Sequence, residues 1–173
     1  CLTEGIQQNI ISKGVKPSKT SLVTNGVDVE LFGETGINIQ ANIRKNLALE
    51  GKFVAMYLGA HGKYNSLDTI VKAAIALKDF NKIIFVFVGD GEQKKHLEQL
   101  VSEEKLDNVV FHPPVKRRDA PAMLSAANCF LLPNLSGDFF KGNLPNKVFD
   151  FLAASRPIIV AGRVESANLV EKI

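Results

Sequence analysis

Cysteine and long apolar runs are scarce in this sequence. Its 173 residues include only two cysteines, Cys1 and Cys129, too few for a disulfide framework. No stretch approaches the roughly 20 apolar residues of a membrane-spanning helix, and the first residues lack the basic and then apolar order of a secretory signal. The net charge of +3 is too small to predict a nucleic-acid partner. These absences exclude disulfide-knotted and collagen-like classes and favour a cytoplasmic protein.

After residue 51, short apolar runs alternate with amphipathic segments. The composition, 46% hydrophobic and 23% charged, is that of an ordinary globular domain. We expect strands at residues 53–58, 82–88, 108–111, 129–132 and 157–161. We expect helices at residues 66–77, 92–104, 143–154 and 165–171, and one capped by Asp119. Nearly continuous apolar strands separated by helices predict an α/β fold: a doubly wound, mainly parallel sheet with helices on both faces.

The N-terminal part of the chain is less regular. Thr3 can cap a first helix, and residues 16–19 form a polar connector. Residues 20–24 alternate like a short strand that stops at Asn25-Gly26, a strong turn dipeptide. For residues 34–51 we expect a loop followed by a short helix.

Glycines follow the first expected strand, at the edge where an open α/β sheet binds its ligands. Gly59 and Gly62 let backbone amides approach an anion, or they only form a tight turn. Between them, after Ala60, His61 could donate to a phosphate or sugar hydroxyl or remain a solvated side chain. Lys63 is either a phosphate partner or a surface lysine. This turn is therefore a candidate site for an anionic ligand.

A second glycine turn, Gly89-Asp90-Gly91, follows the next strand. It does not complete the GxGxxG fingerprint of dinucleotide-binding domains, because Lys94 occupies the third glycine position. Asp90 can cap the helix that follows. Support for a nicotinamide cofactor is therefore weak.

The helix expected at residues 143–154 begins with residues that suit a phosphate. Helix N-termini bind phosphate, and Asn143 can cap this one. Lys147 lies in its first turn, where a positive charge opposes the helix dipole unless an anion is bound. Asp150 lies one turn further on and can accept hydrogen bonds from ribose hydroxyls. We therefore regard this helix start as a second candidate phosphate site.

Two further features concern charge and metals. Residues 116–118 form a short basic cluster. This cluster either belongs to a solvated loop or attracts phosphates or anionic lipid headgroups. The histidines and cysteines are scattered along the chain, so we expect no metal site.

The order of motifs along the chain resembles that of a known family. The motifs are, in order, NGVD, YLG, VGDG, NVVFHPPV, DAPAMLSAAN, FLLP and PNKVFDFLAASRPII. They resemble the donor-side half of bacterial family 4, or group 1, retaining glycosyltransferases of GT-B architecture, over residues 3–173. The resemblance implies a Rossmann-like domain, a nucleotide-sugar donor that usually carries UDP, and no metal requirement. It also implies a glycan or lipid-linked acceptor in capsule, lipopolysaccharide or exopolysaccharide synthesis.

The resemblance also implies roles for individual residues. The backbone at Val115 would meet the nucleobase, and Asp150 would hold the ribose. The turn at Gly59 would face the diphosphate and sugar, and the amides near Lys147 and Val148 would bind phosphate. Lys147 would neutralise the leaving diphosphate. The implied site has Lys147 as catalytic residue and, for donor binding, Gly59, Ala60, His61, Lys63, Gly89, Asp90, Gly91, Val115, Asn143, Val148 and Asp150.

Three positions depart from the family pattern. Many relatives carry arginine, lysine and glutamate where this chain has Ala60, Asn65 and Gly142. Either another lysine supplies the missing positive charge, namely Lys63, Lys94 or Lys147, or the chain binds a donor differently. We keep three alternatives: a UDP-sugar epimerase of the same fold, a non-catalytic nucleotide-binding module, and a nicotinamide oxidoreductase domain.

The resemblance further implies that the chain is one half of an enzyme. GT-B enzymes bind the acceptor through an N-terminal domain and react in the cleft between two domains. We expect residues 1–173 to form the C-terminal, nucleotide-sugar-binding half, with residues 1–19 as a helix and connector beside the other domain. The chain alone should bind nucleotide without transferring sugar. The complete enzyme could associate peripherally with the inner face of the membrane.

Overall fold

A computed structural model describes residues 1–33, 36–134, 144–162 and 165–171. Within these ranges the chain forms a five-stranded sheet in the order β3-β2-β1-β4-β5, and every neighbouring pair is parallel. The strands are β1 (Phe53–Leu58), β2 (Ile83–Val88), β3 (Val109–His112), β4 (Cys129–Pro133) and β5 (Ile158–Ala161). This is the expected doubly wound α/β fold, with the reversal of strand order between β1 and β4.

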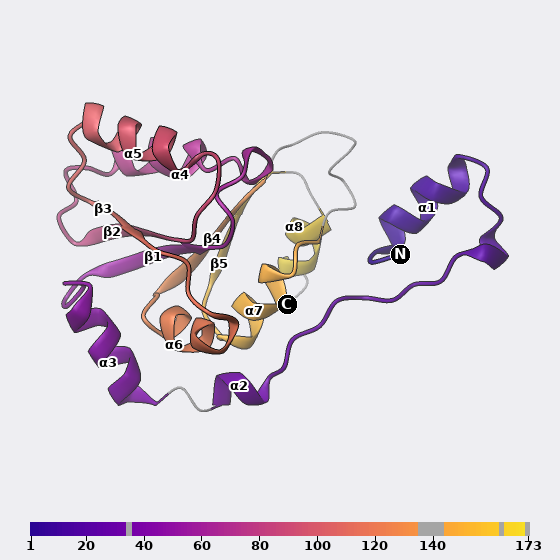
Figure 1. Cartoon of the computed structure of the whole chain (residues 1–173), viewed down its shortest axis with the longest axis horizontal. Coiled ribbons are helices and arrows are strands. Elements are labelled where there is room, and N and C mark those ends of the chain that lie inside the picture. The colour runs from indigo at the N-terminus through magenta and orange to yellow at the C-terminus, as the bar shows by residue number, and fades with distance from the viewer. Residues whose placement is uncertain (34–35, 135–143, 163–164, 172–173) are drawn as a thin grey trace.

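Helices cover both faces of the sheet (Figure 1). One face carries α4 (Asp68–Ala76) and α5 (Lys94–Glu103), and the other carries α3 (Ile37–Asn46), α6 (Ala120–Ser125) and α7 (Lys147–Ala153). The other described helical segments are α1 (Glu4–Ser12), α2 (Glu30–Gly33), α8 (Glu165–Val170), and the 3-10 turns η1 (Pro17–Lys19), η2 (Lys63–Asn65) and η3 (Arg117–Asp119). No helix within the described ranges is both long enough and apolar enough to cross a bilayer.

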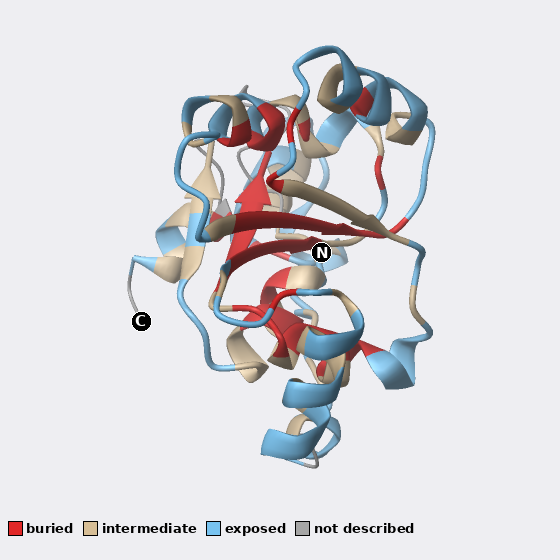
Figure 2. Ribbon diagram, turned by 90° about the vertical axis from the view of Figure 1, so that its left-hand side faces the viewer, coloured by how far each residue is buried: buried red, intermediate tan, exposed pale blue. Residues whose placement is uncertain are grey.

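Successive residues of the central strands pack on opposite faces of the sheet. In β1, Val54 and Met56 join the core beneath α6 and α7, whereas Ala55 and Tyr57 join the core beneath α4 and α5. Buried residues therefore run through the three central strands β2, β1 and β4 (Figure 2). Burial on both faces explains why the strand sequences are continuously apolar.

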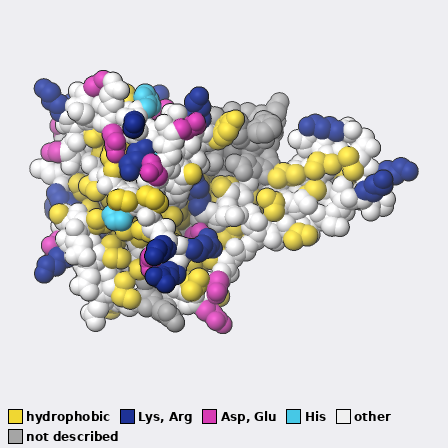
Figure 3. All heavy atoms as spheres, viewed as in Figure 1, with side chains coloured by type: hydrophobic (Ala, Val, Ile, Leu, Met, Phe, Trp, Pro, Cys, Tyr) yellow, Lys and Arg dark blue, Asp and Glu magenta, His cyan; other side chains and the backbone are white. Residues whose placement is uncertain are grey.

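The N-terminal arm carries α1 away from the sheet (Figure 1). Thr3 caps α1 as expected, because its Oγ1 accepts a hydrogen bond from the amide of Ile6 at 3.1 Å. The strand expected at residues 20–24 is wrong: the segment is extended but pairs with no strand of the described chain. Instead, the amide of Val23 donates to the carbonyl of Cys1. Exposed apolar side chains lie along this arm (Figure 3).

Two helices begin later than the capping residues suggested. Ser66 ends η2 with a left-handed backbone (φ +48°), and α4 begins at Asp68. Asp90 does not cap α5, because its carboxylate accepts from the amide of Gly91 at 2.8 Å. Ser66 has a left-handed backbone instead of the extended backbone of an N-cap residue, and the Asp90 carboxylate is already bonded to the neighbouring amide.

The starts of α6 and α7 also differ in detail. Asp119 directly precedes α6, but its side chain makes no capping hydrogen bond. The helix expected from Asn143 begins at Lys147, and Asn143 itself lies outside the described residues. Lys147 is therefore the first residue of α7.

Candidate functional site

A cavity of about 340 Å³ lies where β1, β2 and β3 end. It is lined by residues at the strand ends and in the following loops: Leu58, Gly59, Ala60, Val88, Gly89, Asp90, Pro114 and Val115. The structure thus brings together part of the predicted site, namely Gly59, Ala60, Gly89, Asp90 and Val115. The carboxyl ends of parallel strands meet at one edge, which is why three separate loops form one cavity.

The first two loops pack so closely that glycine is required. A Cβ on Gly89, whose φ is +146°, would lie 2.0 Å from the carbonyl oxygen of Gly59. The amide of Gly59 donates to the carbonyl of Val88 at 2.9 Å, and that of His61 donates to the carbonyl of Asp90 at 2.8 Å. These two amides therefore join the loops to each other, as in the tight-turn alternative, and are not free to bind an anion.

His61 is buried rather than solvated. Its exposed fraction is 0%, and its ring packs against Tyr57, Phe87 and Phe111 with ring centres 6.0, 6.1 and 6.4 Å away. Neither ring nitrogen has a hydrogen-bond partner among the described residues. Burial, followed by the charge of Lys94, lowers the pKa of His61, so the ring is neutral at pH 7. His61 does not line the cavity, although its Nε2 would lie 3.2 Å from a Cβ on the lining residue Gly89.

The ammonium group of Lys147 lies beside the cavity. A Cβ placed on Gly59 would be 3.0 Å from Nζ. Nζ donates to the Tyr57 hydroxyl at 2.7 Å and to Asn65 Oδ1 at 2.9 Å, and it lies 4.4 Å from the centre of the Tyr57 ring. No described carboxylate forms an ion pair with it. Burial lowers the pKa of Lys147 from 10.5 to about 8, so the group is still charged at neutral pH.

The two acceptors of Lys147 are themselves held in place. The Tyr57 hydroxyl donates to the carbonyl of Ala60 at 2.7 Å, and the Asn65 amide donates to the same oxygen at 2.9 Å. Neither role was evident from the sequence, where Asn65 stood only as a departure from the family pattern. For Tyr57, the available signal was a hydroxyl near the end of an otherwise apolar strand.

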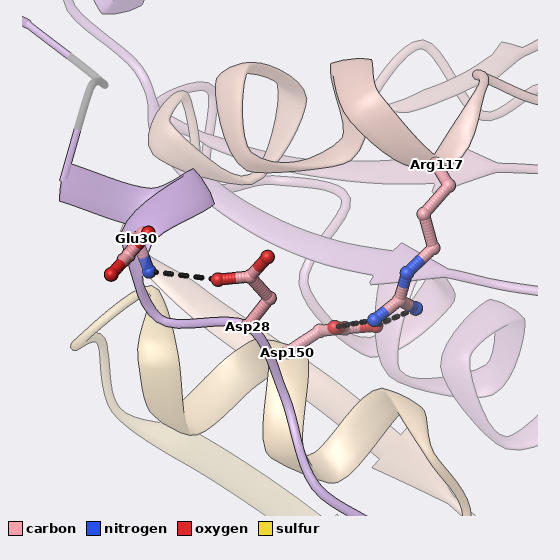
Figure 4. Close-up of polar contacts among 4 residues, drawn as sticks. All are labelled: Asp28, Glu30, Arg117 and Asp150. Carbon is pink, nitrogen blue, oxygen red and sulfur yellow. Dashed lines mark hydrogen bonds and ion pairs between the residues drawn. The ribbon is translucent and has the colours of Figure 1, made fainter.

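Asp150 forms a bidentate ion pair with Arg117 (Figure 4). Both nitrogen–oxygen distances are 3.1 Å, and the pair joins the first turn of α7 to η3. Burial raises the pKa of Asp150, and the charge and hydrogen bonds of Arg117 oppose that rise. Within the basic cluster, Arg117 is therefore a specific partner and not only part of a solvated loop.

Several predicted residues do not line the cavity. Val148 is fully buried in the core, and its amide donates to the carbonyl of Pro145 at 3.0 Å, so of the amides expected to bind phosphate near Lys147 and Val148, the one of Val148 is already bonded. Lys63 is exposed, and neither it nor Gly91 is among the lining residues. Asn143 is not described. Across the described ranges, no three His, Cys, Asp or Glu side chains gather in a way that could hold a metal ion.

Comparison with known sequences identifies a family. Residues 38–168 match the model of the family described as glycosyl transferases group 1. WcaI of Escherichia coli K12, described as a colanic acid biosynthesis glycosyl transferase, is 26% identical over 160 residues, or 92% of this chain and 39% of WcaI. TuaH of Bacillus subtilis 168, described as a teichuronic acid biosynthesis glycosyltransferase, is 26% identical over 82% of this chain and 34% of its own length. The chain thus spans less than two fifths of either relative.

Solved structures share the fold. HepE of Anabaena, in complex with UDP and glucose, has a TM-score of 0.80 at 18% identity, over 94% of this chain and 44% of HepE. WaaG, a glycosyltransferase involved in lipopolysaccharide biosynthesis, has a TM-score of 0.80 at 17% identity, over 99% of this chain and 46% of WaaG. The C-terminal domain of the group 1 family protein LpcC from Francisella tularensis has a TM-score of 0.63 at 19% identity, over 85% of both chains. These similarities confirm the Rossmann-like fold.

Proposed function

The chain belongs to the group 1 glycosyl transferases, and we propose that it is the C-terminal, donor-binding half of a retaining GT-B enzyme. A second, N-terminal domain would bind the acceptor, in keeping with the small share of WcaI and TuaH that the chain spans. Residues 1–19 would lie beside that domain. The domain would also cover apolar side chains of the arm, such as Leu22 (42% exposed) and Val23 (67% exposed). Alone, the chain should bind nucleotide without transferring sugar.

The Lys147 ammonium carries this proposal. It is partly buried, has no described carboxylate partner and adjoins a cavity at the carboxyl edge of the sheet. A charge in such a place is costly unless a counter-ion approaches. The diphosphate of a nucleotide-sugar is a counter-ion of the right sign. As the bond from sugar to diphosphate breaks, Lys147 would stabilise the negative charge that develops on the leaving group.

The cavity and Asp150 suit the nucleoside. Apolar walls from Leu58, Val88 and Pro114 would pack on the base, with the backbone of Val115 at its edge. Asp150 would hold the ribose. A carboxylate offers about four acceptor positions, so two bonds from Arg117 leave others for ribose hydroxyls.

The relatives favour a UDP-linked donor and a role in cell-surface polysaccharide synthesis. The neighbour HepE is solved in complex with UDP-glucose, and WcaI, TuaH and WaaG are described by polysaccharide pathways. We propose transfer of a hexosyl or N-acetylhexosaminyl group from UDP to a glycan or lipid-linked acceptor at the cytoplasmic face of the membrane. Metal-independent transfer is part of the proposal, because Lys147 supplies the positive charge.

Calorimetric titration of the chain with UDP tests the proposal. UDP should bind, NAD should not, and EDTA should leave the UDP affinity unchanged. Lys147→Met keeps the apolar stem but removes the charge, and should weaken UDP binding at least tenfold, or about 1.4 kcal/mol. The matched control is Lys72→Met, an exposed lysine of α4 outside the cavity, which should bind UDP like the wild type.

The alternatives predict different results. A folded chain that releases no heat with UDP at several temperatures would contradict donor binding and favour a non-catalytic module. Interconversion of UDP-sugar epimers without an acceptor, by this chain joined to its other half, would favour the epimerase.

A further inference from the structure

Two neutral side chains surround the Lys147 ammonium, and the proposed donor site does not by itself require them. We propose that Tyr57 and Asn65 are positioning residues, which hold this ammonium charged beside Gly59 so that it can meet the donor diphosphate. The inference rests on the proposed role of Lys147 in the donor site.

The geometry of the network supports positioning. The three side chains come from β1, η2 and α7, and meet at 2.7 and 2.9 Å. The hydroxyl hydrogen of Tyr57 and the amide hydrogens of Asn65 are directed to the carbonyl of Ala60. The oxygen of each side chain is therefore left to accept from Lys147. An ammonium has three N–H donors, so one remains for a ligand after these two bonds.

Neutral acceptors around a lysine have an electrostatic consequence. Hydrogen bonds to the charged form of a group favour that form, so these bonds oppose the effect of burial on the pKa of Lys147, which is about 8. Among the described residues, Tyr57 contacts the ammonium and His61 interacts with it electrostatically, and the charges of Lys94 and Asp90 also act on His61. Burial raises the pKa of Tyr57 and lowers that of His61, so both are neutral near pH 8. Of Lys147, Tyr57 and His61, Lys147 is therefore the group that changes charge near pH 8.

The same geometry predicts opposite shifts for different substitutions. Tyr57→Phe keeps the ring under the ammonium and removes one acceptor, and the Ala60 carbonyl keeps its bond from Asn65. Asn65→Leu removes the other acceptor. Both changes should lower the pKa of Lys147. Asn65→Asp instead places a carboxylate 2.9 Å from Nζ, and should raise it.

The experiment is UDP titration of each variant across pH 6.5–9.5. With a second phosphate pKa of about 6, roughly a quarter of the UDP still carries a proton at pH 6.5, but this fraction is the same for every variant, so differences between variants report on the protein. Wild-type affinity should fall with a midpoint near pH 8. Tyr57→Phe and Asn65→Leu should move that midpoint down by about one pH unit, which predicts a ~3-fold loss of affinity at pH 7.5 and little loss at pH 6.5. Asn65→Asp should move the midpoint up. Asn46→Leu, an exposed amide of α3 outside the cavity, should leave it unchanged.

The outcomes separate this inference from the proposed function. If Lys147→Met weakens binding but Tyr57→Phe and Asn65→Leu keep the wild-type midpoint, Lys147 meets the diphosphate and the positioning inference is wrong. If Lys147→Met binds UDP with wild-type affinity at every pH, the proposed function of Lys147 fails. A purely structural role for Tyr57 and Asn65 would lower the affinity equally at every pH, which would also overturn the inference. Nuclear magnetic resonance of the Lys147 side chain measures the same pKa shifts directly, without ligand.

Discussion

Replacing Arg117 with methionine removes both hydrogen bonds that it donates to the Asp150 carboxylate, but keeps most of its apolar length. The Asp150 side chain is 11% exposed, whereas that of Arg117 is 62% exposed. Breaking a buried ion pair costs ~3–5 kcal/mol, and an exposed pair contributes only ~0–1 kcal/mol. Because the guanidinium is screened by water and the carboxylate is not, we expect a loss of about 1–2 kcal/mol in the free energy of unfolding at pH 7.

The pH dependence of this loss follows from the pKa of Asp150. Burial raises it above the ordinary value of 3.8, and Arg117 opposes the rise. Without Arg117 the pKa rises further. A raised pKa in the folded state means that the protonated acid contributes stability, fully below pH 3.8 and progressively less as pH rises through the folded value. Arg117→Met should therefore cost least in acid, where the protonated carboxyl needs no cation, and most near neutrality.

A double-mutant cycle measured by urea unfolding tests this reasoning. In an Asp150→Asn background, Arg117→Met should cost much less than in the wild type, because no buried carboxylate is left unpaired. Arg118→Met is the matched control. Arg118 is 76% exposed and pairs with Asp119, itself half exposed, at a distance of 3.7 Å, so its replacement should leave the free energy of unfolding nearly unchanged. Equal losses for Arg117→Met in both backgrounds, or a loss that does not change with pH, would refute the account.

Three further predictions concern stability. Gly89→Ala should lower the free energy of unfolding by at least about 2 kcal/mol in urea or thermal denaturation, because its Cβ would clash with the Gly59 carbonyl at a φ of +146°; wild-type stability would contradict the close packing. Arg44→Ala should lower the free energy of unfolding by about 2–3 kcal/mol, because the guanidinium donates to three backbone carbonyls, including that of Ala126 at 2.7 Å. Arg44→Lys should retain only part of this stability. The wild-type free energy of unfolding should fall as pH drops below 6.5, because His61 takes up a proton in the unfolded chain but resists it when buried. His61→Phe should lose less of this free energy between pH 7 and pH 5. An unchanged slope against pH would be inconsistent with the buried neutral ring.

The sheet could be predicted from the sequence because its signal is local. Strands buried on both faces must be apolar at every position, and residues 53–58 and 83–88 are. The cap at Thr3 was equally local, since its hydroxyl bonds to an amide three residues away. The same local logic failed at residues 20–24, because an alternating segment becomes a strand only if a partner strand lies beside it.

Part of the candidate site was also predictable. Gly59 and Gly89 follow adjacent parallel strands that end in register, as the pairing of Leu58 with Val88 shows. Loops at the carboxyl edge of such a sheet meet whatever their sequence, so their convergence on one cavity follows from topology. The sequence also shows that Ala60, Asn65 and Gly142 lack the charges that many relatives carry at these positions. Gly142 lies outside the described residues, and the structure gives Asn65 a new role as an acceptor for Lys147.

The sequence by itself determined the alternation of strands and helices, the buried faces and the glycine turns, because each depends on neighbours along the chain. Only the tertiary structure decided which side chains meet. Lys147 reaches Tyr57 and Asn65 across 90 and 82 residues, and Arg117 reaches Asp150 across 33. Such contacts depend on how α7 lies against β1, η2 and η3, and hydrogen bonding and burial then set the pKa of each group. No local pattern encodes that placement, because it results from the packing of the whole core.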